Sequence, residues 1–78
     1  MAKSKTFPEV WASLDVYQRR ELKAAVLAAT MVSEVAFWQW AKGERKPRLF
    51  PVVTAVTDAV NRTLGTSYTY AQLFPINS

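Results

Sequence analysis

Apolar side chains recur every three or four residues along most of this 78-residue chain, and this spacing constrains the fold more than any other feature. One such stripe consists of Leu22, Ala25, Val26 and Ala29. This spacing places side chains on one face of an α-helix, whereas a half-buried strand needs alternation every two residues. The pattern therefore predicts an all-α fold.

Helix-start and helix-stop signals divide the chain into four or five helices packed in a compact bundle. Thr6-Phe7-Pro8-Glu9 and Asp15-Val16-Tyr17-Gln18 both match the capping box, and Ser33 is a suitable N-cap. Gly43 and Gly65 each follow a segment with helical spacing, as helix-ending glycines do. The expected helices cover about residues 6–14, 15–29, 33–42 and 50–64, with one further turn within 68–74 that lays Tyr70, Leu73 and Phe74 on the core.

The segment 50–64 contains two conflicting signals. It is rich in β-branched residues, which favour strands. Its apolar positions nevertheless recur at three and four, and the segment is longer than a typical strand. We therefore predict a helix whose inward stripe is Val52, Ala55, Val56, Ala59, Val60 and Leu64.

The composition excludes several classes of function. The chain has no cysteine and no histidine, so disulfides, thiolate chemistry and almost every zinc arrangement are ruled out. Its six acidic residues have ordinary positions at helix starts, on helix faces or in a basic loop, and no glycine-rich phosphate loop is present. We therefore expect no enzyme activity, no cofactor and no small-molecule substrate.

The length and hydropathy indicate a single domain over residues 6–78, preceded by a flexible basic tail over residues 1–5. No stretch approaches the roughly 20 apolar residues that span a bilayer, and the N-terminus lacks the apolar run of a signal peptide. These observations predict a cytoplasmic protein with no membrane partner.

The formal charge of +4 is concentrated in two places. One is the tail, with Lys3 and Lys5, and the other is the segment 42–48. A clustered basic patch is typical of a polyanion-binding protein, although a merely solvated surface explains the charge alone equally well.

The segment from Thr30 to Arg48 has the layout of the second half of a helix-turn-helix. In that motif one helix crosses the DNA backbone and the next enters the major groove. Here these helices would cover residues 19–29 and 33–42, and a basic, proline-containing loop follows Gly43. The inward residues of the second helix are Phe37 and Trp40, with Ala41 or Ala36.

The outward face of the helix 33–42 supplies candidates for reading base edges, namely Glu34, Val35, Trp38 and Gln39. Gln39 can bond an adenine edge in two places, Glu34 can accept from cytosine, and Val35 can touch a thymine methyl. Phosphate contacts give affinity and salt dependence but no sequence reading. The candidates for them are Ser33, Lys42, Arg45, Lys46 and Arg48, with Lys3 and Lys5 as a possible arm along the duplex.

The sequence between about Asp15 and Pro75 resembles phage repressor/Cro-like helix-turn-helix proteins. The residues that carry the resemblance are Val32-Ser33, Phe37, Trp40, Lys42-Gly43-Glu44-Arg45-Lys46-Pro47, Leu64-Gly65 and Leu73-Phe74-Pro75. The resemblance implies a five-helix, lambda-repressor-like domain, usually a transcriptional repressor or related regulator. It also implies that the partner is double-stranded operator DNA, bound by a homodimer.

Two features depart from this family pattern. Met31 occupies the turn position where such proteins commonly carry glycine, and a left-handed backbone there would cost roughly 1 kcal/mol without glycine. Val35 and Trp38 also make the outward face unusually apolar. Trp38 could pack under the basic loop, face the groove or anchor a protein partner. The last possibility gives an alternative function, a protein-interaction or dimerisation module that uses Val35 and Trp38 and does not read DNA.

Overall fold

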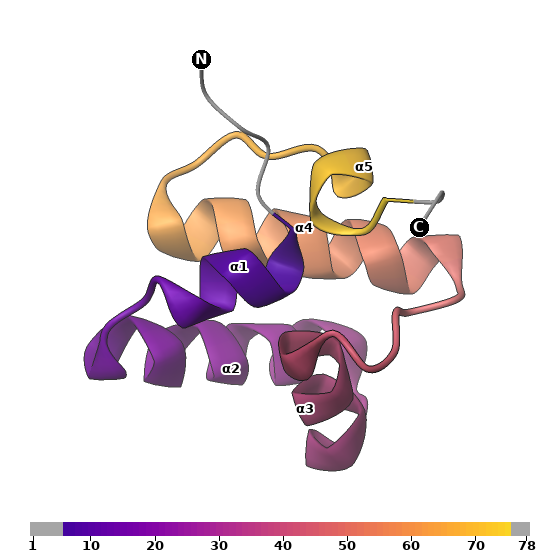
Figure 1. The fold of residues 1–78 in the computed structure, drawn as a ribbon, viewed down its shortest axis with the longest axis horizontal. Helices are drawn as coiled ribbons and strands as arrows, with labels where there is room; N and C mark the ends of the chain where they lie inside the picture. The colour runs from indigo at the N-terminus through magenta and orange to yellow at the C-terminus, as the bar shows by residue number, and fades with distance from the viewer. Residues whose placement is uncertain (1–5, 76–78) are drawn as a thin grey trace.

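The computed structural model describes residues 6–75, and all regular secondary structure in this part of the chain is helical (Figure 1). The tail 1–5, including Lys3 and Lys5, lies outside the described residues. The prediction of an all-α fold is confirmed. The helices are α1 (Phe7–Ala12), α2 (Val16–Thr30), α3 (Glu34–Lys42), α4 (Phe50–Leu64) and α5 (Tyr70–Leu73).

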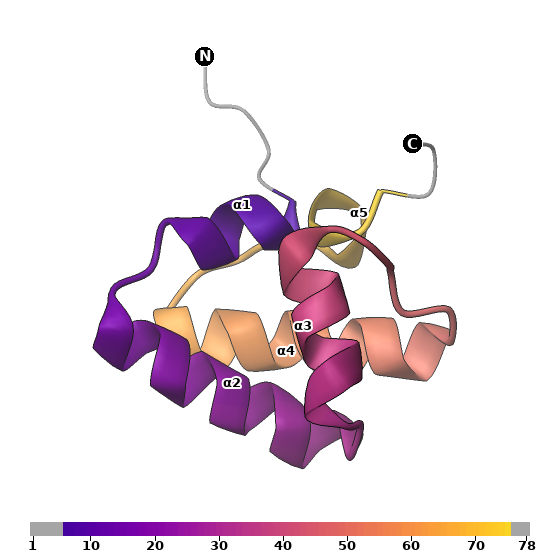
Figure 2. The same cartoon turned by 60° about the horizontal axis from the view of Figure 1, so that its bottom comes forward.

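The two long helices, α2 and α4, form the most extensive interhelical contact and run in roughly opposite directions (Figure 1). Helix α3 runs steeply across them in Figure 2 and packs against both α1 and α2. Helix α5 packs on α4. This arrangement leaves one long side of α3 and the loop that follows it on the outside of the molecule.

The short helix α1 joins the other helices through an aromatic core. Phe7 is fully buried, and its ring lies 6.1 Å from that of Phe37 in α3 and 5.4 Å from that of Phe74 after α5. Trp11, one turn further along α1, contacts Phe37 edge to face with ring centroids 5.1 Å apart. Aromatic pairs in such arrangements add stabilisation beyond the area they bury. Helix α1 therefore holds α3 in place.

The predicted helix starts are confirmed. The Asp15 carboxylate accepts a hydrogen bond from the backbone N–H of Gln18 at 2.8 Å, and the Gln18 side chain accepts one from the N–H of Asp15 at 3.1 Å. Glu9 accepts from the backbone N–H of Thr6 at 2.9 Å. These bonds satisfy N–H groups that a helix start leaves without partners.

Segment 50–64 forms a helix despite its β-branched residues, because burial of one face outweighs their intrinsic preference. The predicted stripe missed Val53 and Thr57, which are both buried. Burial of Thr57 is compatible with its hydroxyl, which donates to the carbonyl oxygen of Val53 at 2.9 Å.

Two side chains predicted to lie on the core do not. Ala29 is exposed, since it lies in the last turn of α2 beside the surface residues Asp58 and Arg62 of α4. Tyr70 is 41% exposed, and its ring instead packs edge to face on that of Phe50 at the surface, 5.2 Å away.

The turn between α2 and α3 keeps a left-handed residue even though the sequence supplies no glycine. Met31 has φ 59° and ψ 25°, and its backbone N–H donates to the carbonyl oxygen of Leu27 at 2.8 Å. Its side chain is 85% exposed. Side-chain packing therefore contributes little at Met31, and the backbone strain is borne by the rest of the fold.

Candidate nucleic-acid interface

Helix α3 divides into a buried and an exposed face as the sequence predicts. Phe37, Trp40 and Ala41 are buried, and Ala36 is only half-buried. The exposed side chains are Glu34, Val35, Trp38 and Lys42, and Gln39 is half-buried beside them. The four residues expected to read base edges therefore lie together on the outward side of α3.

Both ends of α3 are fixed by local hydrogen bonds. The Ser33 side chain accepts from the backbone N–H of Ala36 at 3.3 Å, as an N-cap does. Gly43 ends the helix with φ 80°, and a Cβ atom at this position would lie 3.3 Å from Cγ of Pro8. The backbone N–H groups of Glu44 and Arg45 both donate to the carbonyl oxygen of Gln39, at 2.9 and 3.3 Å. The start of the basic loop is thus held against the end of α3.

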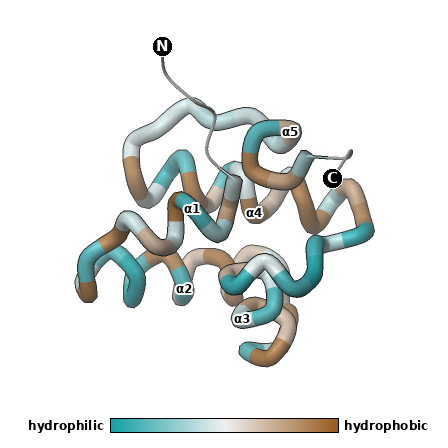
Figure 3. The backbone as a smooth tube through the Cα atoms, in the orientation of Figure 1, coloured by the Kyte–Doolittle hydropathy of each residue, from teal (hydrophilic) through white to brown (hydrophobic). Residues whose placement is uncertain are grey.

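The four cations predicted to contact phosphates, Lys42, Arg45, Lys46 and Arg48, are all exposed. Figure 3 shows the loop between α3 and α4 as a largely hydrophilic stretch. Lys46 has a partner within the chain, because its Nζ donates to the carbonyl oxygen of Pro75 at 2.7 Å. The ion pairs formed by residues 6–75 involve neither Lys42 nor Arg45 nor Arg48. These three cations are available to an external anion.

Trp38 packs against α1 and α2. Its ring meets that of Trp11 edge to face, with centroids 5.5 Å apart, and Nζ of Lys23 lies 5.2 Å from its centre. The tryptophan beside the basic loop is Trp40, which lines a cleft with residues 43–48. The interpretation that placed Trp38 under the loop is therefore wrong, and 38% of Trp38 remains exposed.

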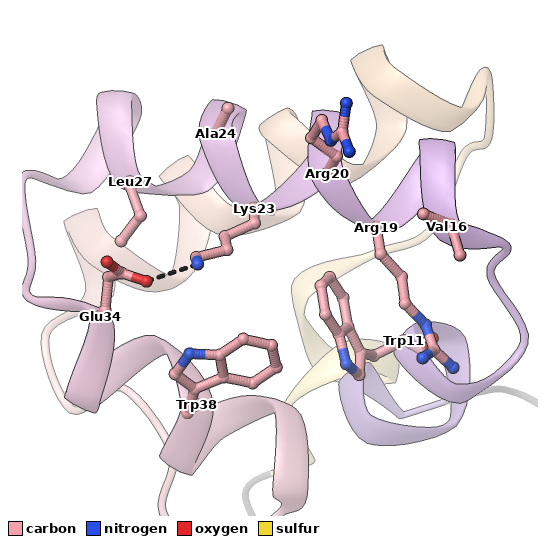
Figure 4. Close-up of a pocket in the computed structure, with 9 residues that line it drawn as sticks. All are labelled: Trp11, Val16, Arg19, Arg20, Lys23, Ala24, Leu27, Glu34 and Trp38. Carbon is pink, nitrogen blue, oxygen red and sulfur yellow. Dashed lines mark hydrogen bonds and ion pairs between the residues drawn. The ribbon is translucent and has the colours of Figure 1, made fainter.

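A groove of about 590 Å³ lies between α2 and the exposed side of α3 (Figure 4). Its lining includes three cations of α2, which are Arg19, Arg20 and Lys23. Arg19 is committed to the end of α1, since it donates to the carbonyl oxygens of Trp11 and Ala12, both at 3.2 Å. Arg20 is exposed. These three cations were not among the site residues predicted from the sequence. Their position on the polar side of the helix that precedes α3 could have indicated them.

Lys23 and Glu34 form an ion pair across this groove, drawn as a dashed line in Figure 4. Glu34 is the first residue of α3, where a carboxylate also interacts favourably with the positive end of the helix dipole. A residue expected to read bases is therefore neutralised by a cation from the preceding helix.

A second group of exposed apolar side chains lies away from α3, at the start of α4 and on α5. It consists of Leu49, Phe50 and Tyr70. Sequence reasoning missed this group because it assigned Tyr70 to the core.

Comparison of the chain with protein-family models, with curated proteins and with solved structures found no match. The site is therefore interpreted from its own geometry. Within residues 6–75, no three histidine, cysteine, aspartate or glutamate side chains are grouped so that they could hold a metal ion. No helix in the same part of the chain is long and apolar enough to cross a bilayer.

Proposed function

We propose that this protein binds double-stranded DNA and acts as a small transcriptional regulator in the cytoplasm. In this proposal α2 and α3 form the helix-turn-helix of a lambda-repressor-like domain, and α3 enters the major groove. The observation that supports it best is the continuity between the exposed side of α3 and the cationic loop, which the Gly43 cap holds together.

The loop cations supply affinity in this proposal. Arg45 and Arg48 are exposed and have no ion-pair partner among the described residues, and Lys42 lies in the last turn of α3. Each phosphate neutralised by such a cation releases counterions, so the affinity falls steeply as salt is added. Lys46 can contribute while bonded to Pro75, because an ammonium group has three donors.

The residues on α3 supply sequence preference. Gln39 can pair with an adenine edge, and Val35, which is 68% exposed, can contact a thymine methyl. Ser33 retains its hydroxyl proton for a phosphate, since its oxygen only accepts from Ala36 in the cap.

The test is a titration of a labelled duplex over a range of salt concentrations. If Arg45 and Arg48 each contact a phosphate, replacing both by glutamine lowers the slope of log affinity against log salt by about 1.8. The matched control is Arg62→Gln, which also replaces an arginine by glutamine but at a position that pairs with Asp58 on α4, outside the proposed interface. This variant should leave the salt slope unchanged. Absence of binding at low salt, or binding that is insensitive to salt, would refute the proposal.

The second candidate function is a protein-interaction or dimerisation module of the same fold. It is favoured by the exposure of Val35 on α3. Light scattering on the wild type and on Val35→Ser and Trp38→Ala separates the two functions. Loss of an oligomer in either variant with DNA binding retained would assign that side chain to a protein contact. A wild type that is already a monomer would count against a dimerisation module.

A further inference from the structure

We infer that the ion pair between Lys23 and Glu34 exchanges its partners on DNA, so that Lys23 moves to a phosphate while Glu34 accepts from cytosine. The inference rests on the proposed function and names the base that the site prefers. It makes Lys23, a residue of α2, part of sequence recognition by α3.

The placement of the pair supports this role. Lys23 and Glu34 face each other across the groove between α2 and α3, with Trp38 beside them (Figure 4). Nζ of Lys23 lies 5.2 Å from the centre of the Trp38 ring. The ammonium group therefore lies beside the exposed side of α3, and its release by the carboxylate would free it to pair with a phosphate.

The ion pair also neutralises a negative charge on the surface that we propose binds DNA. Glu34 is the only acidic residue of α3, and without a partner its carboxylate would repel the phosphates that approach this helix. Pairing with Lys23 neutralises it. The same pairing keeps Lys23 from contributing a phosphate contact.

The strengths of the two interactions favour exchange at one base. An exposed ion pair changes an equilibrium constant by about fivefold at most. A good bidentate contact with a base edge discriminates by about fivefold to a hundredfold, and a charge-assisted contact with the single amino group of cytosine falls at the lower end of this range. Cytosine offers the carboxylate an amino donor with no acceptor beside it. The amino donor of adenine lies next to its N7 acceptor, and guanine and thymine present acceptors that repel a carboxylate. Glu34 therefore leaves Lys23 opposite cytosine and stays paired over sequences without it.

The experiment compares wild type and Glu34→Gln on two duplexes, one of dA·dT pairs and one of dG·dC pairs, across a salt range. On dA·dT the ion pair of the wild type stays closed, so Glu34→Gln releases Lys23 to a phosphate and steepens the salt slope by about 0.9. On dG·dC the wild type already releases Lys23, so the slopes of the two proteins agree. Comparing variants on the same duplex cancels the difference in shape between the two DNAs.

Two further variants show which group is responsible. Asp58→Asn removes the same charge from the ion pair of α4, which lies against a different side of α2, and leaves both slopes unchanged. Adding Lys23→Gln to Glu34→Gln returns the dA·dT slope to the wild-type value, because the released cation is gone.

Each alternative result has its own meaning. If the wild type binds both duplexes and Glu34→Gln has the same salt slopes as Asp58→Asn, the exchange is overturned. The proposed function is then unaffected. An equal increase in slope on both duplexes overturns the cytosine preference. No wild-type binding to either duplex at low salt overturns the proposed function and the exchange together.

Discussion

Replacing Met31 by glycine is expected to stabilise the protein. Met31 is the one non-glycine residue with a positive φ among residues 6–75, and its side chain is 85% exposed. The substitution therefore removes backbone strain and sacrifices little packing. The hydrogen bond from the backbone N–H of residue 31 to Leu27 involves no side-chain atom and is kept.

The magnitude follows from two opposing effects. An L-residue in the left-handed region costs roughly 1–2 kcal/mol relative to glycine. Glycine loses more backbone entropy on folding, and this loss offsets roughly 0.5–1 kcal/mol of the stabilisation. The net stabilisation lies in the range of about 0–1.5 kcal/mol, with a central value of about 0.75 kcal/mol. For a chain of this size, 1 kcal/mol corresponds to a shift in Tm of about 4–8 °C.

Thermal unfolding followed by circular dichroism measures the effect, with urea unfolding as a second measure of the free energy. Met31→Ala is the matched control, because it removes the exposed side chain but keeps the Cβ atom that causes the strain. Its stability should stay within about 0.5 kcal/mol of the wild type. If Met31→Gly melts no higher than Met31→Ala, the left-handed backbone is not a source of strain and the reasoning is refuted.

The same unfolding assays test four further substitutions. Gly43→Ala should cost about 1–2 kcal/mol and more than Gly65→Ala, because both have a positive φ but only the former brings a Cβ against Pro8. Asn61→Ala should cost about 2–3 kcal/mol, because the Asn61 side chain bonds both the N–H and the carbonyl of Tyr68, at 2.8 and 2.9 Å. Thr57→Val should change stability by less than about 1 kcal/mol, since the lost hydroxyl leaves no buried group without a partner. A small effect at Asn61, or a large one at Thr57, would contradict these expectations.

The helices could be predicted from sequence because their signals are local. A cap such as Asp15 with Gln18 involves residues three apart, and helical spacing identifies the buried face of α3 without knowledge of its neighbours. The wrong predictions concern residues whose burial depends on tertiary contacts. Tyr70 satisfies the spacing rule, but it packs on Phe50 at the surface because Leu73 and Phe74 fill the core next to α5.

The candidate site was predictable in part for the same reason. The outward side of α3 follows from the inward positions of Phe37 and Trp40, and both are buried. The pairing of Lys23 with Glu34 depends on the angle at which α3 crosses α2, and that angle is fixed by packing between residues distant in sequence. No local sequence pattern therefore predicts this ion pair.

The position of Trp38 changes how the apolar character of α3 should be interpreted. A tryptophan on the outward side of this helix suggests at first a contact for an apolar partner. Its ring, however, continues the edge-to-face contacts that run from Phe37 through Trp11, and Lys23 covers part of it. Packing between helices therefore explains why an aromatic residue occurs here, although 38% of Trp38 remains exposed. The side of α3 offered to a partner therefore combines the exposed part of Trp38 with Val35, the half-buried Gln39 and the ion-paired Glu34. The polar groups of this surface suit the proposed base contacts.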